Sequence, residues 1–268
     1  MKPLHEIRKD IVRVCHELDR REYVGGRDGN ISVLLRNKAI LVTRAGVRKG
    51  DVTSDDLLRV DLHGERIEGR GRPSTETGMH VRIYELRKDV GAVVHAHPPV
   101  ATGFAAAGLG MSECVLPEVI VGLGRVPIAR YATPGTEELS RSIDPWIAEH
   151  DAILLENHGV VTVGPDVLTA HQRMENVEHA ARILLVARLL GGAQLLAPDQ
   201  VAELVGSRAR YGVRQGLAGC DLPPVAERSA PAEAPSPPDS GSRASELGPG
   251  DEALVERVLA RLKERRAD

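Results

Sequence analysis

Cysteine is scarce in this chain of 268 residues. The three cysteines, Cys15, Cys114 and Cys220, are odd in number and widely separated. They lack the paired spacing of a disulfide framework or of a zinc knuckle. We therefore expect no disulfide framework and a reducing, intracellular environment.

The chain has neither a large excess of charge of one sign nor a long apolar run. The chain has 35 Lys and Arg against 38 Asp and Glu, a formal net charge of −3. Nucleic-acid binding usually requires a basic field, so we expect small molecules or proteins as partners and no nucleic acid. Residues 1–14 lack the apolar core of a signal peptide, and no segment has the length of a membrane span. These features predict a cytoplasmic protein without a membrane segment.

Apolar residues with helical spacing predict three helices. Near the start, the apolar positions lie three or four residues apart, at Leu4, Ile7, Ile11, Val14 and Leu18. This spacing predicts an amphipathic helix that ends before Gly25. A second helix is expected from about Ser74, and a long one over residues 166–190, before two glycines.

Short apolar runs separated by turn residues predict strands. Residues 31–35 and 39–43 flank a polar turn, and residues 57–69 contain a His-Gly turn, so both regions are expected to form hairpins. Residues 92–97 predict a buried strand, and residues 153–164 predict two strands that meet near Asn157-His158-Gly159. The pattern indicates a mixed α and β core.

The composition changes near the C-terminus. Residues 1–221 are expected to form one folded domain, and residues 222–250 a disordered linker rich in Pro, Ala and Ser. Residues 251–268 become amphipathic again and predict a short helix. Because so short a helix is marginal in isolation, its apolar face is expected to dock on its own domain or on a partner.

Two histidines, His95 and His97, lie two residues apart at the end of the predicted strand 92–97. Residues at this spacing share one face of a strand, with or without a metal. A catalytic zinc site normally takes three protein ligands and leaves one position open. His158, which precedes a glycine at another predicted strand end, is the candidate third ligand.

Glu76 lies at the start of the second predicted helix, just after Ser74 and Thr75. An acid there is favoured by the helix dipole, and the two hydroxyl residues are typical of a cap. A helix N-terminus of this kind is also able to bind a phosphate. The glycine-containing turns 26–32 and 43–47 present further backbone N–H groups for an anion.

Taken together and in order, these motifs resemble the class II aldolase/adducin family over about residues 5–215, and within it the aldolases that cleave L-fuculose 1-phosphate. The motifs are Gly29-Asn30, TRAG 43–46, PSTE 73–76, HAH 95–97, YATPGTEEL 131–139 and NHG 157–159. The resemblance implies an α/β fold, a three-layer α/β/α sandwich with a central, largely antiparallel sheet. It also implies a homotetramer with active sites between subunits.

The resemblance assigns roles to individual residues. His95, His97 and His158 match ligands of one Zn²⁺ per subunit, and Glu76 matches a fourth ligand that also serves as the catalytic base. The positions that match the phosphate-binding set are Gly29, Asn30, Ala45, Gly46, Ser74 and Thr75.

The sequence departs from the family pattern at several of these positions. Ala45 replaces a threonine, so a hydroxyl contact is missing there. Glu118 stands where the aldolase has a tyrosine that protonates a sugar oxygen, and burial would have to raise its pKa for the same role. Pro134 replaces an aromatic residue near the aldehyde half of the substrate. Tyr211 matches a tyrosine of a C-terminal segment that closes over the substrate, or is an exposed tail residue.

The implied activity is zinc-dependent cleavage of a ketose 1-phosphate, such as L-fuculose 1-phosphate, to dihydroxyacetone phosphate and an aldehyde such as L-lactaldehyde. Alternatives on the same fold are a methylthioribulose-1-phosphate dehydratase, a sugar-phosphate 4-epimerase and a non-catalytic adducin-like interaction module. The C-terminal linker and helix resemble the encapsulation peptides of bacterial microcompartments, which implies shell proteins as partners of residues 251–268.

Overall fold

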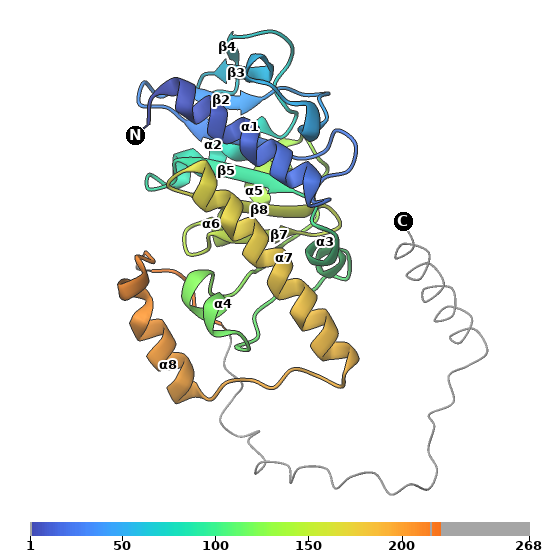
Figure 1. Cartoon of the computed structure of the whole chain (residues 1–268), viewed down its shortest axis with the longest axis vertical. Helices are drawn as coiled ribbons and strands as arrows, with labels where there is room; N and C mark the ends of the chain where they lie inside the picture. The colour runs from blue at the N-terminus through green and yellow to red at the C-terminus, as the bar shows by residue number, and fades with distance from the viewer. Residues whose placement is uncertain (1, 215, 221–268) are drawn as a thin grey trace, which may run out of the picture. The chain divides into compact units, whose positions relative to one another are not determined.

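An eight-stranded sheet lies between two layers of helices in the computed structural model, which describes residues 2–214 and 216–220 (Figure 1). The strand order is β4-β3-β2-β1-β5-β8-β7-β6. Every neighbouring pair is antiparallel except β6 with β7. The strands are β1 Asn30–Leu34, β2 Ile40–Thr43, β3 Leu57–Val60, β4 Arg66–Glu68, β5 Ala92–Ala96, β6 Ile128–Ala129, β7 Ala152–Leu155 and β8 Gly159–Gly164.

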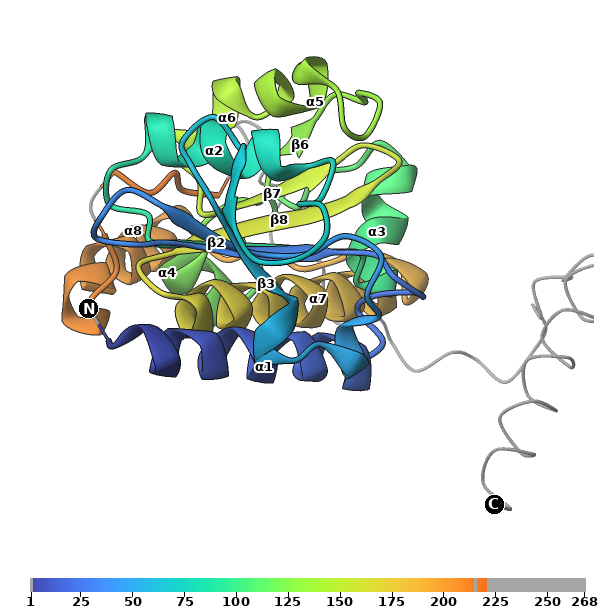
Figure 2. The same cartoon turned by 90° about the horizontal axis from the view of Figure 1, so that it is seen from above.

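The helices divide between the two faces of the sheet (Figure 2). One face carries α1 Leu4–Arg20 and α7 Val167–Leu189, with α3 Pro99–Ala106 packed on α7 and with α4 Pro117–Gly122 against α8 Pro198–Ser207. The other face carries α2 Thr77–Leu86, α5 Glu137–Ser142 and α6 Asp144–Ile147. Three 3₁₀ turns complete the described elements, η1 Lys49–Asp51, η2 Ser54–Asp56 and η3 Arg208–Tyr211. The predicted three-layer α/β/α sandwich with its largely antiparallel sheet is confirmed.

Strand β5 separates two apolar cores. Val94 packs into the core shared with α1 and α7, whereas Val93 packs into the core shared with α2. Because side chains alternate along a strand, His95 projects to the same side as Val93, the side on which α2 lies. The sheet therefore directs the end of β5 toward the N-terminus of α2.

The predicted elements are confirmed in most places. The first helix, the long helix α7 and the hairpins β1–β2 and β3–β4 form as expected. Helix α2 begins at Thr77, three residues later than expected, because Pro73 bridges to Arg44 and Thr77 N–H closes a turn on Ser74 O. Glu76 is consequently the N-cap residue and not part of the first turn.

Two of the three cysteines form a disulfide, Cys114–Cys220, with Cα atoms 5.3 Å apart. The expectation of no disulfide was wrong for this pair. The fold returns the chain after α8 to the loop before α4, and no local spacing rule detects partners separated by 106 residues. Because disulfides are typical of oxidising compartments, the bond does not agree with the expected reducing environment.

The C-terminal predictions fall outside the described residues. These are the boundary after residue 221, the linker 222–250 and the segment 251–268. Among the helices of residues 2–214 and 216–220, none combines the length and apolar character needed to span a lipid bilayer.

Candidate metal centre and its pocket

Three histidines converge where β5 ends and β7 turns into β8. His95 is in β5, His97 follows it, and His158 lies in the β7–β8 turn. Their ring centroids are 4.8–5.2 Å apart, and one nitrogen from each ring lies within 4.8 Å of the others. Because β5 pairs with β8, residues about 60 positions apart in the sequence meet at one sheet end.

Gly159 makes room for this convergence. A Cβ atom at this position would lie 2.5 Å from His97 Cδ2 and 2.7 Å from the Ala96 carbonyl oxygen. Both distances are shorter than any ordinary contact. The glycine after His158 is therefore required for the His97 ring to approach the β7–β8 turn.

Glu76 reaches the histidines from the N-cap of α2. Its Oε1 lies 2.9 Å from His158 Nε2, and its Oε2 lies 3.3 Å from His95 Nε2. The side-chain amide of Asn30 donates to Oε2 at 2.6 Å and fixes the carboxylate further. The carboxylate is largely buried, so it has few water molecules to compete with these partners.

The hydrogen bonding of His95 selects the tautomer that a metal requires. Its Nδ1 lies 2.9 Å from the Val160 carbonyl oxygen, which can only accept, so Nδ1 carries the proton. In the neutral ring Nε2 then presents a lone pair to His97 Nε2, 3.1 Å away. Two nitrogen ligands of a tetrahedral zinc ion are about 3.3 Å apart, given bonds of about 2.0–2.1 Å. The donor spacing therefore fits one small divalent cation.

Protonation also favours a cation at this place. Burial lowers the pKa of His95 and of His97 to about 4, so both rings are neutral near pH 7. Burial alone would raise the pKa of Glu76, but the interaction with His95 and the hydrogen bonds from His158 and Asn30 hold that pKa well below its usual range. Neutral imidazoles with an ionised carboxylate are the donor set that Zn²⁺ and similar ions bind.

The residues predicted to bind phosphate lie in the same place. A cavity of about 370 Å³ is lined by Glu76, His97 and His158 and by all six of these residues, namely Gly29, Asn30, Ala45, Gly46, Ser74 and Thr75. Gly29 has φ +72°, and a Cβ there would lie 2.9 Å from the His95 carbonyl oxygen. The turn that contains Gly29 therefore packs directly against the backbone of His95, a candidate metal ligand.

Sequence reasoning missed the buried Thr43 of this cavity and, less expectedly, its buried Lys49. It lies in η1, two residues after the turn 43–47, and a lysine in such a polar stretch looks like an ordinary surface residue. Only the packing of η1 against α1 buries the side chain. Arg27, Asp28, Arg44 and Pro134 also line the cavity.

Glu118 and Tyr211 line a different cavity, of about 570 Å³, together with residues of α7 and α8. Both residues are exposed, and neither lines the cavity of the histidines. Within one chain the structure therefore brings these two residues together and does not bring them to the candidate metal centre.

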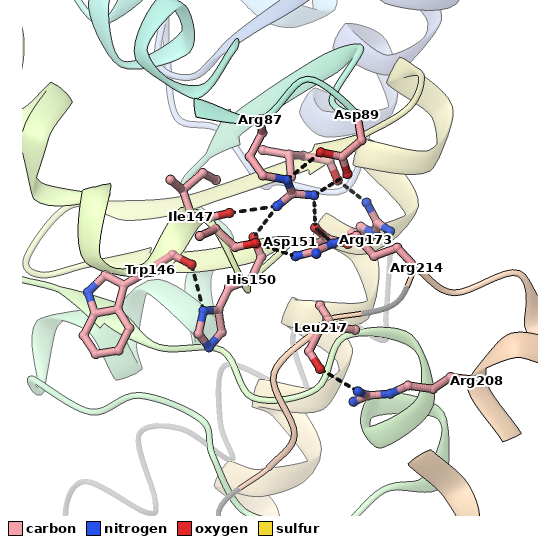
Figure 3. Close-up of polar contacts among 12 residues, drawn as sticks. Arg87, Asp89, Trp146, Ile147, His150, Asp151, Arg173, Arg208, Arg214 and Leu217 are labelled. Atoms are coloured by element: carbon pink, nitrogen blue, oxygen red, sulfur yellow. Dashed lines mark hydrogen bonds and ion pairs between the residues drawn. The ribbon is translucent and has the colours of Figure 1, made fainter. Parts of the chain in front are cut away.

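Buried ion pairs hold the chain after Tyr211 to the domain (Figure 3). The Asp151 carboxylate, at the start of β7, pairs with Arg87 at 2.9 Å, Arg173 at 2.8 Å and Arg214 at 3.0 Å. The Asp151 side chain has no exposed surface. Arg214 therefore ties the chain that follows η3 to the residue that precedes β7.

Arg208 makes a second attachment just before Tyr211. Its guanidinium donates at 2.7 Å to the Ile120 carbonyl of α4 and at 2.7 Å to the Leu217 carbonyl (Figure 3 shows the latter bond). With the ion pair of Arg214, the segment that carries Tyr211 is fixed on both sides. Tyr211 itself remains 71% exposed at the rim of the second cavity.

Comparison with known proteins agrees with this geometry. The family model described as Class II Aldolase and Adducin N-terminal domain matches residues 9–185. An L-fuculose phosphate aldolase of Methanococcus maripaludis is 30% identical over 182 residues, which cover 68% of this chain and 97% of the relative. A 3-oxo-tetronate 4-phosphate decarboxylase of Pectobacterium atrosepticum is 31% identical over 203 residues, 74% of this chain and 91% of the relative.

A solved structure of an L-fuculose 1-phosphate aldolase superposes with a TM-score of 0.71 at 27% identity, covering 77% of this chain and 97% of that one. The residues that the family model matches, 9–185, include every strand of the sheet and the three histidines. The family model covers more than half of the chain, and a relative of at least 30% identity covers two thirds of it. The chain therefore belongs to the class II aldolase and adducin family.

Proposed function

We propose that this class II aldolase-family enzyme cleaves a ketose 1-phosphate, L-fuculose 1-phosphate or a related deoxysugar, to dihydroxyacetone phosphate and an aldehyde such as L-lactaldehyde. The observation that carries the proposal is one cavity lined by His97, His158, Glu76 and two glycine turns. Candidate metal ligands and residues of the two glycine-containing turns line the same cavity. That combination suits a substrate with a carbonyl at one end and a phosphate at the other.

His95, His97 and His158 would hold one Zn²⁺, with Glu76 as a fourth ligand in the resting enzyme. Bound there, the ion supplies Lewis-acid stabilisation of the negative charge that develops on the substrate carbonyl oxygen. The chain's own residues provide the remaining chemistry. The bond from His95 Nδ1 to the Val160 carbonyl orients that ring before any ligand arrives.

Glu76 is the proposed base. In the condensation direction its ionised carboxylate takes a proton from the carbon beside the carbonyl of dihydroxyacetone phosphate, and that carbon forms the new C–C bond to the aldehyde. In cleavage the C3–C4 bond breaks, its electron pair remains on C3, and Glu76, after taking up a proton from water, delivers that proton to C3. The hydrogen bond from Asn30 at 2.6 Å keeps the carboxylate in position.

In cleavage the proton of the C4 hydroxyl would pass to Glu118 or Tyr211 of a neighbouring subunit. A neighbouring subunit is needed because, within one chain, both residues line a cavity separate from that of the histidines. A homotetramer with active sites between subunits would bring the two sets together. We propose that assembly together with the activity.

A decarboxylase is the second candidate. The observation in its favour is the 31% identity to the 3-oxo-tetronate 4-phosphate decarboxylase. Both reactions break a C–C bond and leave an electron pair on a carbon beside a carbonyl, so the same residues serve either. The difference is the leaving group, an aldehyde or carbon dioxide.

A product assay separates the two activities. Purified full-length protein, with its divalent metal content measured, is incubated with a small panel of ketose 1-phosphates and, separately, with a 3-oxo-tetronate 4-phosphate. Dihydroxyacetone phosphate is followed with a coupled dehydrogenase, and carbon dioxide is trapped. Release of dihydroxyacetone phosphate and an aldehyde from a ketose 1-phosphate supports the aldolase. Release of carbon dioxide and dihydroxyacetone phosphate from the 3-oxo-tetronate 4-phosphate, with no ketose 1-phosphate cleaved, supports the decarboxylase, and protein without stoichiometric divalent metal would contradict both.

We also propose that the enzyme acts in the cytoplasm inside a bacterial microcompartment, with residues 251–268 contacting shell proteins and with a shell interior oxidising enough to keep the Cys114–Cys220 bond. The support is the composition of the C-terminal part, a Pro/Ala/Ser-rich linker followed by an amphipathic segment. A shell would confine a reactive aldehyde product.

A further inference from the structure

Lys49 is a buried cation in the wall of the candidate phosphate pocket. It is 2% exposed and is among the largest fully buried side chains of the described residues. Its neighbours in the cavity wall include Gly29, Asn30 and Gly46. Lysine is seldom buried without a partner, because an ammonium loses much hydration free energy when it leaves water.

The ammonium of Lys49 connects the two glycine-containing turns. Its Nζ lies 3.4 Å from the Arg27 carbonyl oxygen in the turn 26–32, and 3.3 Å from the Val47 carbonyl oxygen in the turn 43–47. These are long hydrogen bonds to neutral acceptors. An ammonium has three donors, so two weak bonds leave one donor and most of the charge uncompensated.

No carboxylate lies within ion-pair distance of Lys49 in the part of the chain that the structure describes. Burial lowers the pKa of Lys49, and the more distant Asp28 and Glu76 carboxylates only partly oppose this effect. The other cations of the cavity wall differ from it. Arg44 is already paired with Asp56 at 2.7 Å, and Arg27 is exposed.

We propose that Lys49 determines the specificity of this pocket for a phosphorylated substrate. Its ammonium joins the two turns through their carbonyl groups and supplies the buried positive charge that a phosphate dianion balances. The inference deepens the proposed function and rests on it for the identity of the substrate. It also accounts for Ala45, because a buried charge compensates for the hydroxyl that this position lacks.

The experiment compares Lys49→Met with Lys88→Met in metal-loaded, full-length protein. Lys88 is an exposed lysine whose ammonium also donates to a backbone carbonyl, that of Tyr84, at 3.2 Å. The Kd of inorganic phosphate is measured by calorimetry, and KM and kcat are measured with the ketose 1-phosphate that the wild-type enzyme cleaves. Lys49→Met should raise the Kd and KM about tenfold to a hundredfold, with little change in kcat, while Lys88→Met leaves both constants unchanged.

A structural role alone predicts a different result. Equal losses of metal content, melting temperature and kcat in Lys49→Met, without a selective rise in the phosphate Kd, would overturn the proposal. So would a phosphate Kd within threefold of the wild-type value, or phosphate binding that disappears only when zinc is removed. A larger loss in Arg27→Met than in Lys49→Met would assign the charge to Arg27 and also overturn the proposal.

Two further measurements cover the remaining outcomes. Lys49→Gln keeps a donor for one turn carbonyl without the charge, and should lose phosphate affinity as Lys49→Met does if either variant folds. In unsubstituted protein, the NMR signal of the buried lysine Cε should shift during phosphate titration, and an unshifted signal contradicts the proposal. If wild-type protein cleaves no ketose 1-phosphate but binds phosphate more tightly than Lys49→Met does, the proposed aldolase activity is refuted and the role of Lys49 in phosphate binding is retained.

Discussion

Glu76 Oε1 lies 2.9 Å from His158 Nε2, although 82 positions separate the two residues in the chain. The contact joins the N-cap of α2 to the β7–β8 turn, across the end of β5 that carries His95. One carboxylate oxygen faces His158 and the other faces His95, so Glu76 closes the group of histidines from the α2 side. In the proposed function the three imidazoles hold the ion, which leaves Glu76 available for proton transfer.

The first prediction concerns Glu76→Gln. The amide keeps the shape of the side chain but is not a base, so we expect stoichiometric metal to remain and the rate constant of cleavage to fall about 10²–10⁴-fold. Metal content by plasma mass spectrometry and product release together test this. Loss of metal in Glu76→Gln would instead make Glu76 an essential ligand.

The second prediction concerns His95→Ala. Removal of this ring leaves two imidazoles and takes away the ligand whose tautomer is fixed by Val160, so metal and activity should both be lost. His179→Ala is the matched control, because His179 is exposed on α7. A His95→Ala protein that keeps one tightly bound ion per subunit would contradict the proposed ligand set.

The third prediction uses Gly159→Ala, which changes no ligand. The added methyl would lie 2.5 Å from His97 Cδ2 and would push that ring away from the site. We expect metal affinity to fall about tenfold or more, comparable to the loss of a group that orients a ligand. Gly103→Ala, where a Cβ meets nothing within 4 Å, is the control. Equal metal affinity in both variants would show that the β7–β8 turn relaxes freely.

Much of the secondary structure was predictable from the sequence, because local patterns of apolar and turn residues determine it. The helical spacing of apolar residues from Leu4 to Leu18 and the polar turn between β1 and β2 depend on neighbours in the chain. The histidine pair was ambiguous at that level. Only the antiparallel pairing of β5 with β8 places His158 beside His97, and the order of motifs predicted that meeting through family resemblance.

Other features depend on packing that no short pattern encodes. The burial of Lys49 results from η1 packing on α1, and the Cys114–Cys220 bond results from the return of the chain to α4. The location of Glu118 and Tyr211 in a separate cavity also follows from that return. A residue-by-residue resemblance gives such residues a role without saying which subunit supplies them.

The fourth prediction concerns Asp151→Asn. This substitution removes the buried carboxylate that pairs with Arg87, Arg173 and Arg214 in the cluster of Figure 3. A buried charge left without its partner typically costs about 3–5 kcal/mol, so the free energy of unfolding should fall by about that amount. Urea unfolding measures it. Asp89→Asn is the milder control, because Asp89 pairs with Arg87 at 2.7 Å but is 55% exposed. Equal small losses would show that water solvates the cluster.

The fifth prediction concerns truncation after Asp221. The candidate metal ligands and both cavities described above lie in residues 2–214, so a protein of residues 1–221 should bind metal and substrate as the full chain does. When both forms are co-expressed with shell proteins, only the full chain should purify with the shells. Packaging of the truncated form would remove residues 222–268 as the signal. Loss of metal on truncation would show that the C-terminal part supports the catalytic domain, since none of the proposed ligands lies in it.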